Sequence, residues 1–201
     1  MTITRKPIND LKIHALTADR WDDFAALFGE RGACGGCWCM HWRECRKVYE
    51  ANKGDGNREA MRSLVKHGDE PGLLGYVADV PVAWCAVAPR SDYVRLGGSK
   101  ILAPIDEQPV WSIPCFFVRK DHRRKGLSVK MLKAAIGFVG ERGGRIVEGY
   151  PVEPKAAMVD TFVYTGLAAA FLAAGFQECA RRSDTRPIMR YEIESKNRRQ
   201  K

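Results

Sequence analysis

A basic turn carries the residue pattern with the clearest chemical meaning in this sequence. It follows an apolar run, Val110–Val118, and opens a stretch of helical periodicity. The N-terminus of a helix offers unpaired N–H groups and a partial positive charge, and therefore binds phosphate readily. Glycine allows close approach of an anion, and basic side chains add charge-assisted hydrogen bonds. The predicted pyrophosphate-binding residues are Arg123, Arg124, Lys125, Gly126, Leu127 and Ser128.

By spacing alone, these residues fit a basic surface turn before an ordinary helix as well as they fit a pyrophosphate site. Two other phosphate motifs are excluded, because the glycine spacing of a dinucleotide fingerprint and the Gly-Lys-Ser/Thr of a Walker loop are both absent.

A second segment combines cysteines, glycines and tryptophans. Cys34, Cys37, Cys39 and His41 would supply enough ligands for zinc. No second Cys-x-x-Cys follows at finger or ribbon spacing, so we expect no metal and interpret the segment as a pocket wall. Aromatic walls suit cationic or planar ligands. The predicted pocket residues are Trp38, Cys39, Met40, Trp42, Trp84 and Trp111, the last two of which have a core position as their alternative interpretation.

Composition limits the class of protein. The chain has 201 residues, 45% of them hydrophobic, and a formal net charge of +9. A basic chain suits nucleic acid, a membrane surface or an anionic small molecule. The seven cysteines are an odd number and cannot all pair within the chain. Residues 1–10 lack the apolar core of a signal peptide, and Gly166–Phe176 is too short to span a bilayer. We expect a soluble, cytoplasmic protein with reduced thiols and no membrane partner.

Periodicity and turn residues predict the elements that position these groups. A helix is expected over Asp19–Phe28 with Thr17 as its cap, and a second helix is expected from its cap Asn57 to His67. The other expected helices are Gly126–Glu141 and Gly166–Ala174, and the expected strands are Leu11–Leu16, Leu73–Val77, Val82–Val87, Val110–Val118, Arg145–Tyr150, Phe176–Ala180 and Pro187–Ile193. The order strand, helix, strand around residues 126–141 implies a parallel pair. The predicted class is α/β or α+β, with a mixed sheet and helices on both faces.

The basic turn resembles the acetyl-coenzyme A binding motif of the GNAT superfamily, Arg/Gln-x-x-Gly-x-Gly/Ala. Arg123 and Gly126 match the first and fourth positions, and Ser128 replaces the small sixth residue. The order of the elements is similar to that family over most of the chain, and Gly175-Phe176 stands where GNAT proteins usually carry Gly-Phe. The sequences of residues 34–43 and 147–151 resemble those of a poorly characterised bacterial subgroup of this superfamily. The resemblance implies a GNAT-like mixed central sheet in a single domain, residues 1–195, followed by a basic tail, residues 196–201.

The resemblance also implies acetyl-coenzyme A as co-substrate. Its pantetheine would lie where the central strand and the next parallel strand separate. Proline cannot donate to a strand ladder, so Pro114 supports a bulge at Ile113–Cys115. The backbone of Phe116, Phe117 and Val118 would then face pantetheine, and the Val118 N–H would stabilise charge on the thioester carbonyl.

Acid and base groups are less clearly marked. Many GNAT enzymes use a tyrosine four residues before the Gly of Gly-Phe as the acid, but here that position holds Phe171. Tyr164 is the nearest substitute, with a packing role as its alternative. The base candidates are Glu148 and Asp160, either of which could instead be held in an ion pair.

The predicted function is acetyl transfer from acetyl-coenzyme A to a primary amine of a small molecule or protein. The alternative is a non-catalytic module that senses an acyl-coenzyme A, which Phe171 favours. A nucleic-acid partner is not expected, because no helix-turn-helix, zinc finger or RNP-type pattern is present. The sequence leaves the oligomeric state open between a monomer and a homodimer.

Overall fold

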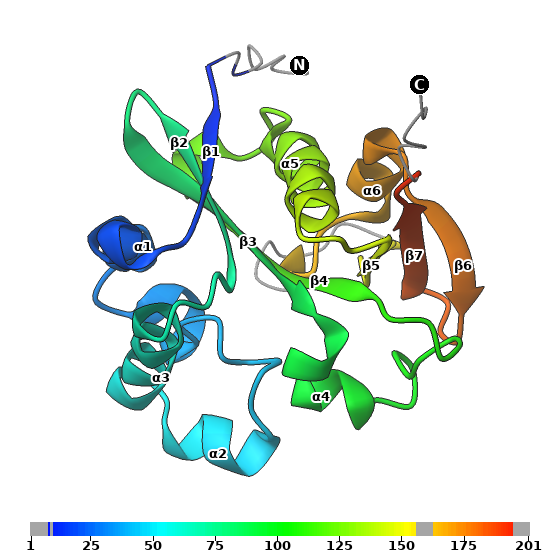
Figure 1. The fold of residues 1–201 in the computed structure, drawn as a ribbon, viewed down its shortest axis with the longest axis horizontal. Helices are drawn as coiled ribbons and strands as arrows, with labels where there is room; N and C mark the ends of the chain where they lie inside the picture. Colours follow the sequence, from blue (N-terminus) through cyan, green and yellow to red (C-terminus); the bar gives the residue numbers. More distant parts are fainter. Residues whose placement is uncertain (1–7, 9, 156–162, 195–201) are drawn as a thin grey trace, which may run out of the picture.

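A mixed sheet organises the molecule. Residues 8, 10–155 and 163–194, which the computed structural model describes, contain seven strands in the order β1-β2-β3-β4-β5-β7-β6 (Figure 1). β4 and β5 pair in parallel, as predicted, and the other neighbours are antiparallel. The strands are β1 Lys12–Ala15, β2 Gly72–Val77, β3 Val80–Pro89, β4 Trp111–Val118, β5 Ile146–Gly149, β6 Gln177–Arg181 and β7 Pro187–Glu192.

Helices cover both faces of the sheet, which confirms the predicted class. α5 and α6 lie on one face, and α1, α2 and α3 lie on the other side of the central strands (Figure 1). A short helix, α4, belongs to the connection between β3 and β4. The helices are α1 Trp21–Phe28, α2 Arg46–Ala51, α3 Asp55–Lys66, α4 Val94–Gly97, α5 Leu127–Glu141 and α6 Ala168–Ala174. Within the described part of the chain, no helix combines the length and apolarity that crossing a membrane requires.

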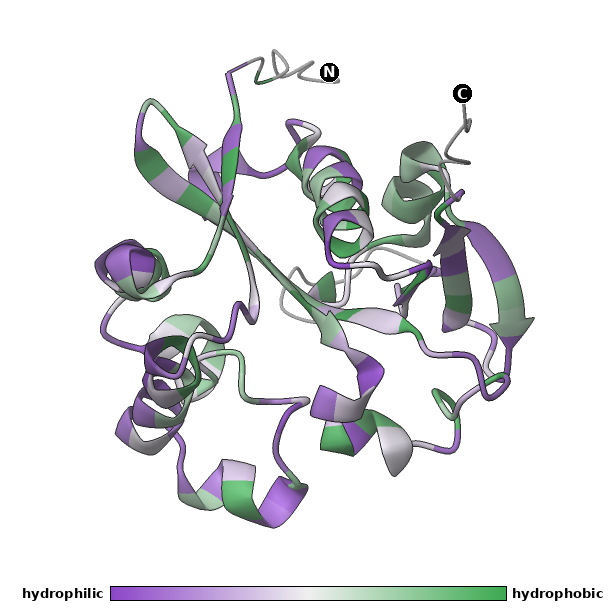
Figure 2. Cartoon of the chain, in the orientation of Figure 1, coloured by the Kyte–Doolittle hydropathy of each residue, from purple (hydrophilic) through white to green (hydrophobic). Residues whose placement is uncertain are grey.

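The sheet separates two apolar cores, because successive side chains of a strand point to opposite faces. Cys85 and Val87 of β3 pack into the core beneath α5, whereas Trp84 and Ala86 pack into the core beneath α1. In Figure 2 the middle of β3 is coloured mainly as apolar, and β6 and β7 carry hydrophilic bands. β3 is therefore a central strand buried on both faces, whereas β6 is an exposed edge.

The pairing of β4 is interrupted on both sides. Ala86 pairs with Cys115 and Ala88 with Ser112, so two β4 residues, Ile113 and Pro114, lie opposite Val87 alone. This confirms the bulge predicted from Pro114. On the other side, the parallel ladder to β5 ends at the pair Ile113–Gly149. β5 itself ends at Gly149, so the second half of β4 has no described strand beside it on this side. We call this interruption the gap between β4 and β5.

Some local predictions were wrong. Asn57 does not cap α3, because the helix begins at Asp55. Instead Asn57 is buried, and its Nδ2 donates to the Gly36 carbonyl at 3.1 Å. Thr17 precedes a short 3₁₀ turn, Ala18–Arg20, without a side-chain cap, because its Oγ1 bonds to the Asp19 carboxylate at 2.5 Å. α2 was not predicted.

Candidate functional site

The basic turn joins β4 to α5. A 3₁₀ turn, Lys120–His122, follows β4, and Gly126 precedes the first residue of α5. Gly126 has φ +79°, in the left-handed region that costs an L-residue energy, so its backbone conformation explains the glycine. The Nε of Arg123 donates to the Val118 carbonyl at 2.9 Å and ties the turn to the end of β4.

The charges of this turn are partly neutralised. His122 and Arg119 both contact Asp121, and the hydrogen bond from His122, followed by that from Arg119, lowers the pKa of Asp121 to about 2. No described carboxylate forms an ion pair with Arg124 or Lys125. These two cations stand beside the N-terminus of α5, so the turn can receive an anion.

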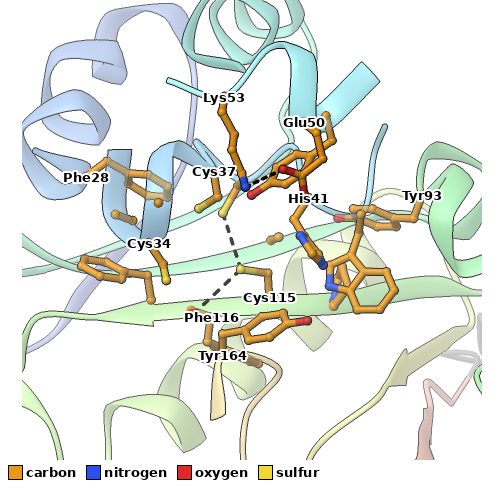
Figure 3. Close-up of a pocket in the computed structure, with 18 residues that line it drawn as sticks. Phe28, Cys34, Cys37, His41, Glu50, Lys53, Tyr93, Cys115, Phe116 and Tyr164 are labelled. Carbon is orange, nitrogen blue, oxygen red and sulfur yellow. Dashed lines mark hydrogen bonds and ion pairs between the residues drawn. The ribbon is translucent and has the colours of Figure 1, made fainter. Parts of the chain in front are cut away.

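A cavity of about 390 Å³ lies next to the gap between β4 and β5 (Figure 3). It is large enough for a small organic molecule. Its wall combines the second half of β4 with the Cys-rich segment, α2 and the residue Tyr164. The lining residues are Phe28, Ala33, Cys34, Gly35, Cys37, Cys39, His41, Trp42, Tyr49, Glu50, Lys53, Ala86, Tyr93, Pro114, Cys115, Phe116, Phe117 and Tyr164.

The predicted pocket residues divide into two groups. Cys39 and Trp42 line the cavity. Trp38, Met40 and Trp84 are buried in the core beneath α1 and are not among the lining residues. Gly32 makes room for Trp38, since a Cβ at Gly32 would lie 2.3 Å from the indole Nε1. For Trp84 the core position, which was the alternative interpretation, is the one observed.

Trp111 lies on the opposite face of the sheet. Its ring meets Phe138 of α5 edge-on, with centroids 6.1 Å apart. It belongs to the core beneath α5 and does not line the cavity. Trp111 and Ile113 pack into the core beneath α5, whereas Cys115 and Phe117 pack into the core beneath α1. Strict alternation would place these odd-numbered residues on one face, so the bulge between Ile113 and Cys115 changes the face.

Four cysteines line the cavity: Cys34, Cys37, Cys39 and Cys115. Cys39 Sγ lies 3.6 Å from Cys115 Sγ. A hydrogen bond from Cys39 lowers the pKa of Cys37 to about 6, whereas burial raises the pKa of Cys39 itself. Cys37 therefore carries thiolate character at neutral pH. Among the described side chains, no group of three or more His, Cys, Asp or Glu is arranged to hold a metal ion.

His41 is held by α4. The Arg95 guanidinium donates to the His41 carbonyl at 2.9 Å and lies 3.1 Å from the ring Nδ1. Burial, followed by the charge of Arg95, lowers the pKa of His41 to about 4. Burial likewise raises the pKa of Tyr49 to about 12. Both groups are therefore neutral at neutral pH.

Glu148 lies in a buried polar cluster. Arg90 donates to its Oε1 at 2.9 Å and Arg190 to its Oε2 at 2.7 Å, and the Tyr150 hydroxyl donates to Oε1 at 2.7 Å. Its side chain is 1% exposed and does not line the cavity. The cluster joins β5 to β7 and to the β3–β4 connection. The sequence allowed Glu148 to be either a base or a member of an ion pair, and the structure shows the ion pair.

Tyr164 contributes to both the gap and the cavity. Its carbonyl accepts the Phe116 N–H at 2.6 Å, and its side chain lines the cavity. Burial raises the pKa of its hydroxyl. The other base candidate, Asp160, lies outside the described residues, as does the basic tail.

The backbone of β4 alternates between its two neighbours. The Phe116 N–H points into the gap, and the Arg119 N–H donates to Val82 of β3 at 2.9 Å. Because N–H groups alternate in an extended strand, Val118 also directs its N–H into the gap, whereas Phe117 directs its N–H to β3. Of the three predicted backbone positions, the structure brings Phe116 and Val118 to the gap, and Phe117 contributes its side chain to the cavity.

Sequence reasoning missed several lining residues. Tyr49 lies on the unpredicted helix α2, and Tyr93 lies in the long connection between β3 and β4. Cys115 was missed although it follows Pro114, the residue that marked the bulge. That bulge was the available signal, because it changes the direction of the side chains that follow it.

The comparison with protein families decides the classification. The model described as the acetyltransferase (GNAT) family matches residues 37–157, more than half of the 201 residues. This chain belongs to the GNAT acetyltransferase family. A search of curated proteins finds no match.

Solved GNAT structures share the fold at low identity. An acetyltransferase of the GNAT family from Streptococcus agalactiae is 14% identical, with a TM-score of 0.54 over 94% of this chain and 99% of that one. The PaiA N-acetyltransferase from Thermoplasma acidophilum, in complex with coenzyme A, is 10% identical, with a TM-score of 0.52 over 92% and 99%. A GNAT acetyltransferase from Listeria monocytogenes is 10% identical, with a TM-score of 0.54 over 91% and 95%. These likenesses show a common fold.

The described residues fit the coenzyme that GNAT acetyltransferases use. A pyrophosphate requires an anion site, which the turn before α5 offers through backbone N–H groups, Arg124 and Lys125. An extended amide chain requires strand backbone groups that are not paired with a neighbouring strand. Beyond Ile113, β4 has no pairing with β5, and its Phe116 N–H donates to the Tyr164 carbonyl, which leaves the Val118 N–H for such a chain. Both features lie on the same strand-to-helix unit.

Proposed function

We propose that the protein transfers an acetyl group from acetyl-coenzyme A directly to a primary amine. One observation carries the proposal: the ladder between β4 and β5 ends at Ile113–Gly149, beside the cavity and ahead of the basic turn. A donor lying along β4 would extend from the anion site to the cavity wall. The cavity would hold the amine, and the acceptor is a small molecule in preference to a protein.

The donor site would be built mainly from backbone. Arg123, Arg124 and Lys125 would neutralise the diphosphate, and N–H groups at Gly126, Leu127 and Ser128 would donate to it. Acetyl-coenzyme A supplies the activated acyl group. The Val118 N–H would stabilise negative charge that develops on the carbonyl oxygen, as preorganised donors do in acyl transfer.

Tyr164 is our proposed acid. Its place at the junction of gap and cavity would let its hydroxyl protonate the departing thiolate. We assign Glu148 a positioning role, because from β5 it binds Arg190 of β7 and Arg90 of the connection between β3 and β4. The apolar cavity would favour the neutral amine, since burial disfavours an ammonium ion.

One observation favours a non-catalytic acyl-coenzyme A sensor as the second candidate. Phe171, at the position where many GNAT enzymes carry the acid, is completely buried in the core beneath α5. A Cβ at Gly149 would lie 2.0 Å from its ring. This side chain is therefore fixed in the core and cannot serve the site.

Calorimetry with coenzyme A and a thiol-release assay across an amine panel separate the two candidates. The enzyme should bind coenzyme A and release thiol with at least one amine. Tyr164→Phe should lower kcat by about 10²-fold, the usual worth of a positioned acid, and leave coenzyme A affinity unchanged. A sensor would bind coenzyme A and release no thiol with any amine.

The donor site has its own control. Reversing charge in the double variant Arg123→Glu, Arg124→Glu should abolish coenzyme A binding, whereas Lys100→Glu, on an exposed loop, should preserve it. Equal affinity in both variants would refute the anion site.

A further inference from the structure

A buried tyrosine hydroxyl at the cavity lacks a partner. Tyr93 is 2% exposed, and its Oη has no hydrogen-bond partner among the described residues. Tyr93 lines the cavity, and Figure 3 shows its hydroxyl end directed toward His41 and Cys115. Most buried polar side chains in proteins are hydrogen-bonded, so an unpartnered one requires an explanation.

Two other buried tyrosines of this chain follow the rule. The Tyr76 hydroxyl donates to Asp23 at 2.8 Å, and the Tyr150 hydroxyl donates to Glu148. The exposed fractions of Tyr76 and Tyr150, 7% and 0%, are similar to that of Tyr93. Burial of a tyrosine in this fold therefore does not by itself leave its hydroxyl without a partner.

A second orphaned atom belongs to the same wall. The indole Nε1 of Trp42 is buried without a partner among the described residues, and Trp42 also lines the cavity. An indole N–H can only donate, whereas a tyrosine hydroxyl can donate or accept. A ligand that satisfies both groups must therefore present a hydrogen-bond acceptor.

The charges of the cavity restrict the rest of the ligand. Glu50 and Lys53 line it, and they pair with each other at 2.5 Å. The remaining described wall is rich in aromatic groups and thiols, and His41 is neutral at neutral pH. The described wall therefore carries one carboxylate and one ammonium group, which balance each other, and Cys37 adds a single thiolate.

We propose that the acceptor amine is small, largely apolar and carries an uncharged carbonyl or ether oxygen, which accepts hydrogen bonds from the Tyr93 hydroxyl and the Trp42 indole N–H. This inference rests on the proposed acetyl transfer and assigns its specificity. We expect polyamines and aminoglycosides, which carry several charges, to be poor acceptors in a wall with so few charged groups.

Matched acceptors test the inference. 4-Methoxyphenethylamine and 4-ethylphenethylamine differ by an oxygen in place of a methylene, and spermidine and kanamycin represent the polycations. The wild type should prefer the methoxy compound over the ethyl compound by about tenfold in kcat/KM, the usual worth of one hydrogen bond. Tyr93→Phe should remove most of that preference, and Tyr76→Phe should keep it. Equal preference in wild type and Tyr93→Phe, no turnover of either phenethylamine, or better turnover of spermidine or kanamycin would overturn the inference.

Thermal unfolding supplies a readout without turnover. Tyr93→Phe should lower Tm less than Tyr76→Phe, because only the second substitution breaks a hydrogen bond within the protein. An equal loss would show that Tyr93 has a protein partner and would overturn the argument. Calorimetry with coenzyme A distinguishes a failure of the proposed function from a failure of this inference. If coenzyme A does not bind, the proposed function is wrong. If it binds but the methoxy compound is not preferred over the ethyl compound, this inference alone is wrong.

Discussion

Gly126→Ala tests whether the turn before α5 depends on a left-handed backbone. An added Cβ would meet nothing within 4 Å, so the substitution creates no steric clash. Its cost is conformational, because an L-residue at φ +79° loses about 1–2 kcal/mol. A chain of this size shifts its Tm by about 2–4 °C for each kcal/mol, so Tm should fall by roughly 2–8 °C.

Gly137→Ala is the matched control in the same helix. Gly137 lies in the interior of α5, is exposed, and also has open space around its Cβ position. Alanine is preferred to glycine inside a helix by about 0.5–1 kcal/mol, so this variant should gain stability. The same added methyl group should therefore shift stability in opposite directions at two positions of one helix.

Urea unfolding gives the stabilities, and calorimetry gives the coenzyme A affinity. Gly126→Ala should also bind coenzyme A about tenfold more weakly, or about 1.4 kcal/mol, because its methyl group stands where the backbone receives the anion. Gly137→Ala should bind as the wild type does. Wild-type stability and affinity in Gly126→Ala would refute the reasoning, since neither the backbone conformation nor the close approach would then matter.

Three further predictions concern titratable groups. Cys37 should react with iodoacetamide at half its maximal rate near pH 6, and Cys39→Ala should move this midpoint upward because it removes the hydrogen bond that lowers the pKa of Cys37. If peptide mapping shows the same pH midpoint for alkylation of Cys37 in Cys39→Ala and in the wild type, the hydrogen bond from Cys39 is not the cause of the lowered pKa. His41 has its pKa lowered from 6.5 to about 4 by burial, so the unfolded chain takes up the additional proton and stability should decline as pH falls from 6.5 toward 4. His41→Gln should flatten this decline in urea unfolding, and a slope equal to that of the wild type would argue against it. Glu148→Gln should cost about 3–5 kcal/mol, because it leaves two buried guanidinium groups without their shared carboxylate. The exposed Glu141→Gln should stay within about 0.5 kcal/mol of the wild type, and similar losses in the two variants would show that the cluster is not stabilising.

Local patterns were enough to predict most of the fold. Period-2 and period-3.6 repeats placed the strands and long helices within a few residues of their bounds, because burial of one face imposes those repeats. Pro114 predicted the bulge because its missing N–H cannot join a ladder. Gly126 marked the turn because its position requires a positive φ.

Residues that depend on distant contacts were predicted less well. Asn57 has the side chain of a helix cap, but the segment around Gly36 packs against it and takes its amide. Trp111 shares the apolar run of β4 with the cavity-lining residues, yet it precedes the bulge, and its ring packs toward α5. Tyr49 lies in the short helix α2 and Tyr93 lies just before the short helix α4, and neither segment has a strong periodic pattern.

The sequence by itself determined the class of fold, the family motif at Arg123 and Gly126, and the position of the break in β4, because each depends on neighbours within a few residues. Only the tertiary structure decided which side chains meet at the cavity. Cys39 and Cys115 are 76 positions apart, and their sulfurs lie 3.6 Å from each other. The ion pairs of Glu148 depend on two arginines that come from other elements. Such contacts follow from strand register and helix packing, which are set by burial over the whole chain and not by local sequence.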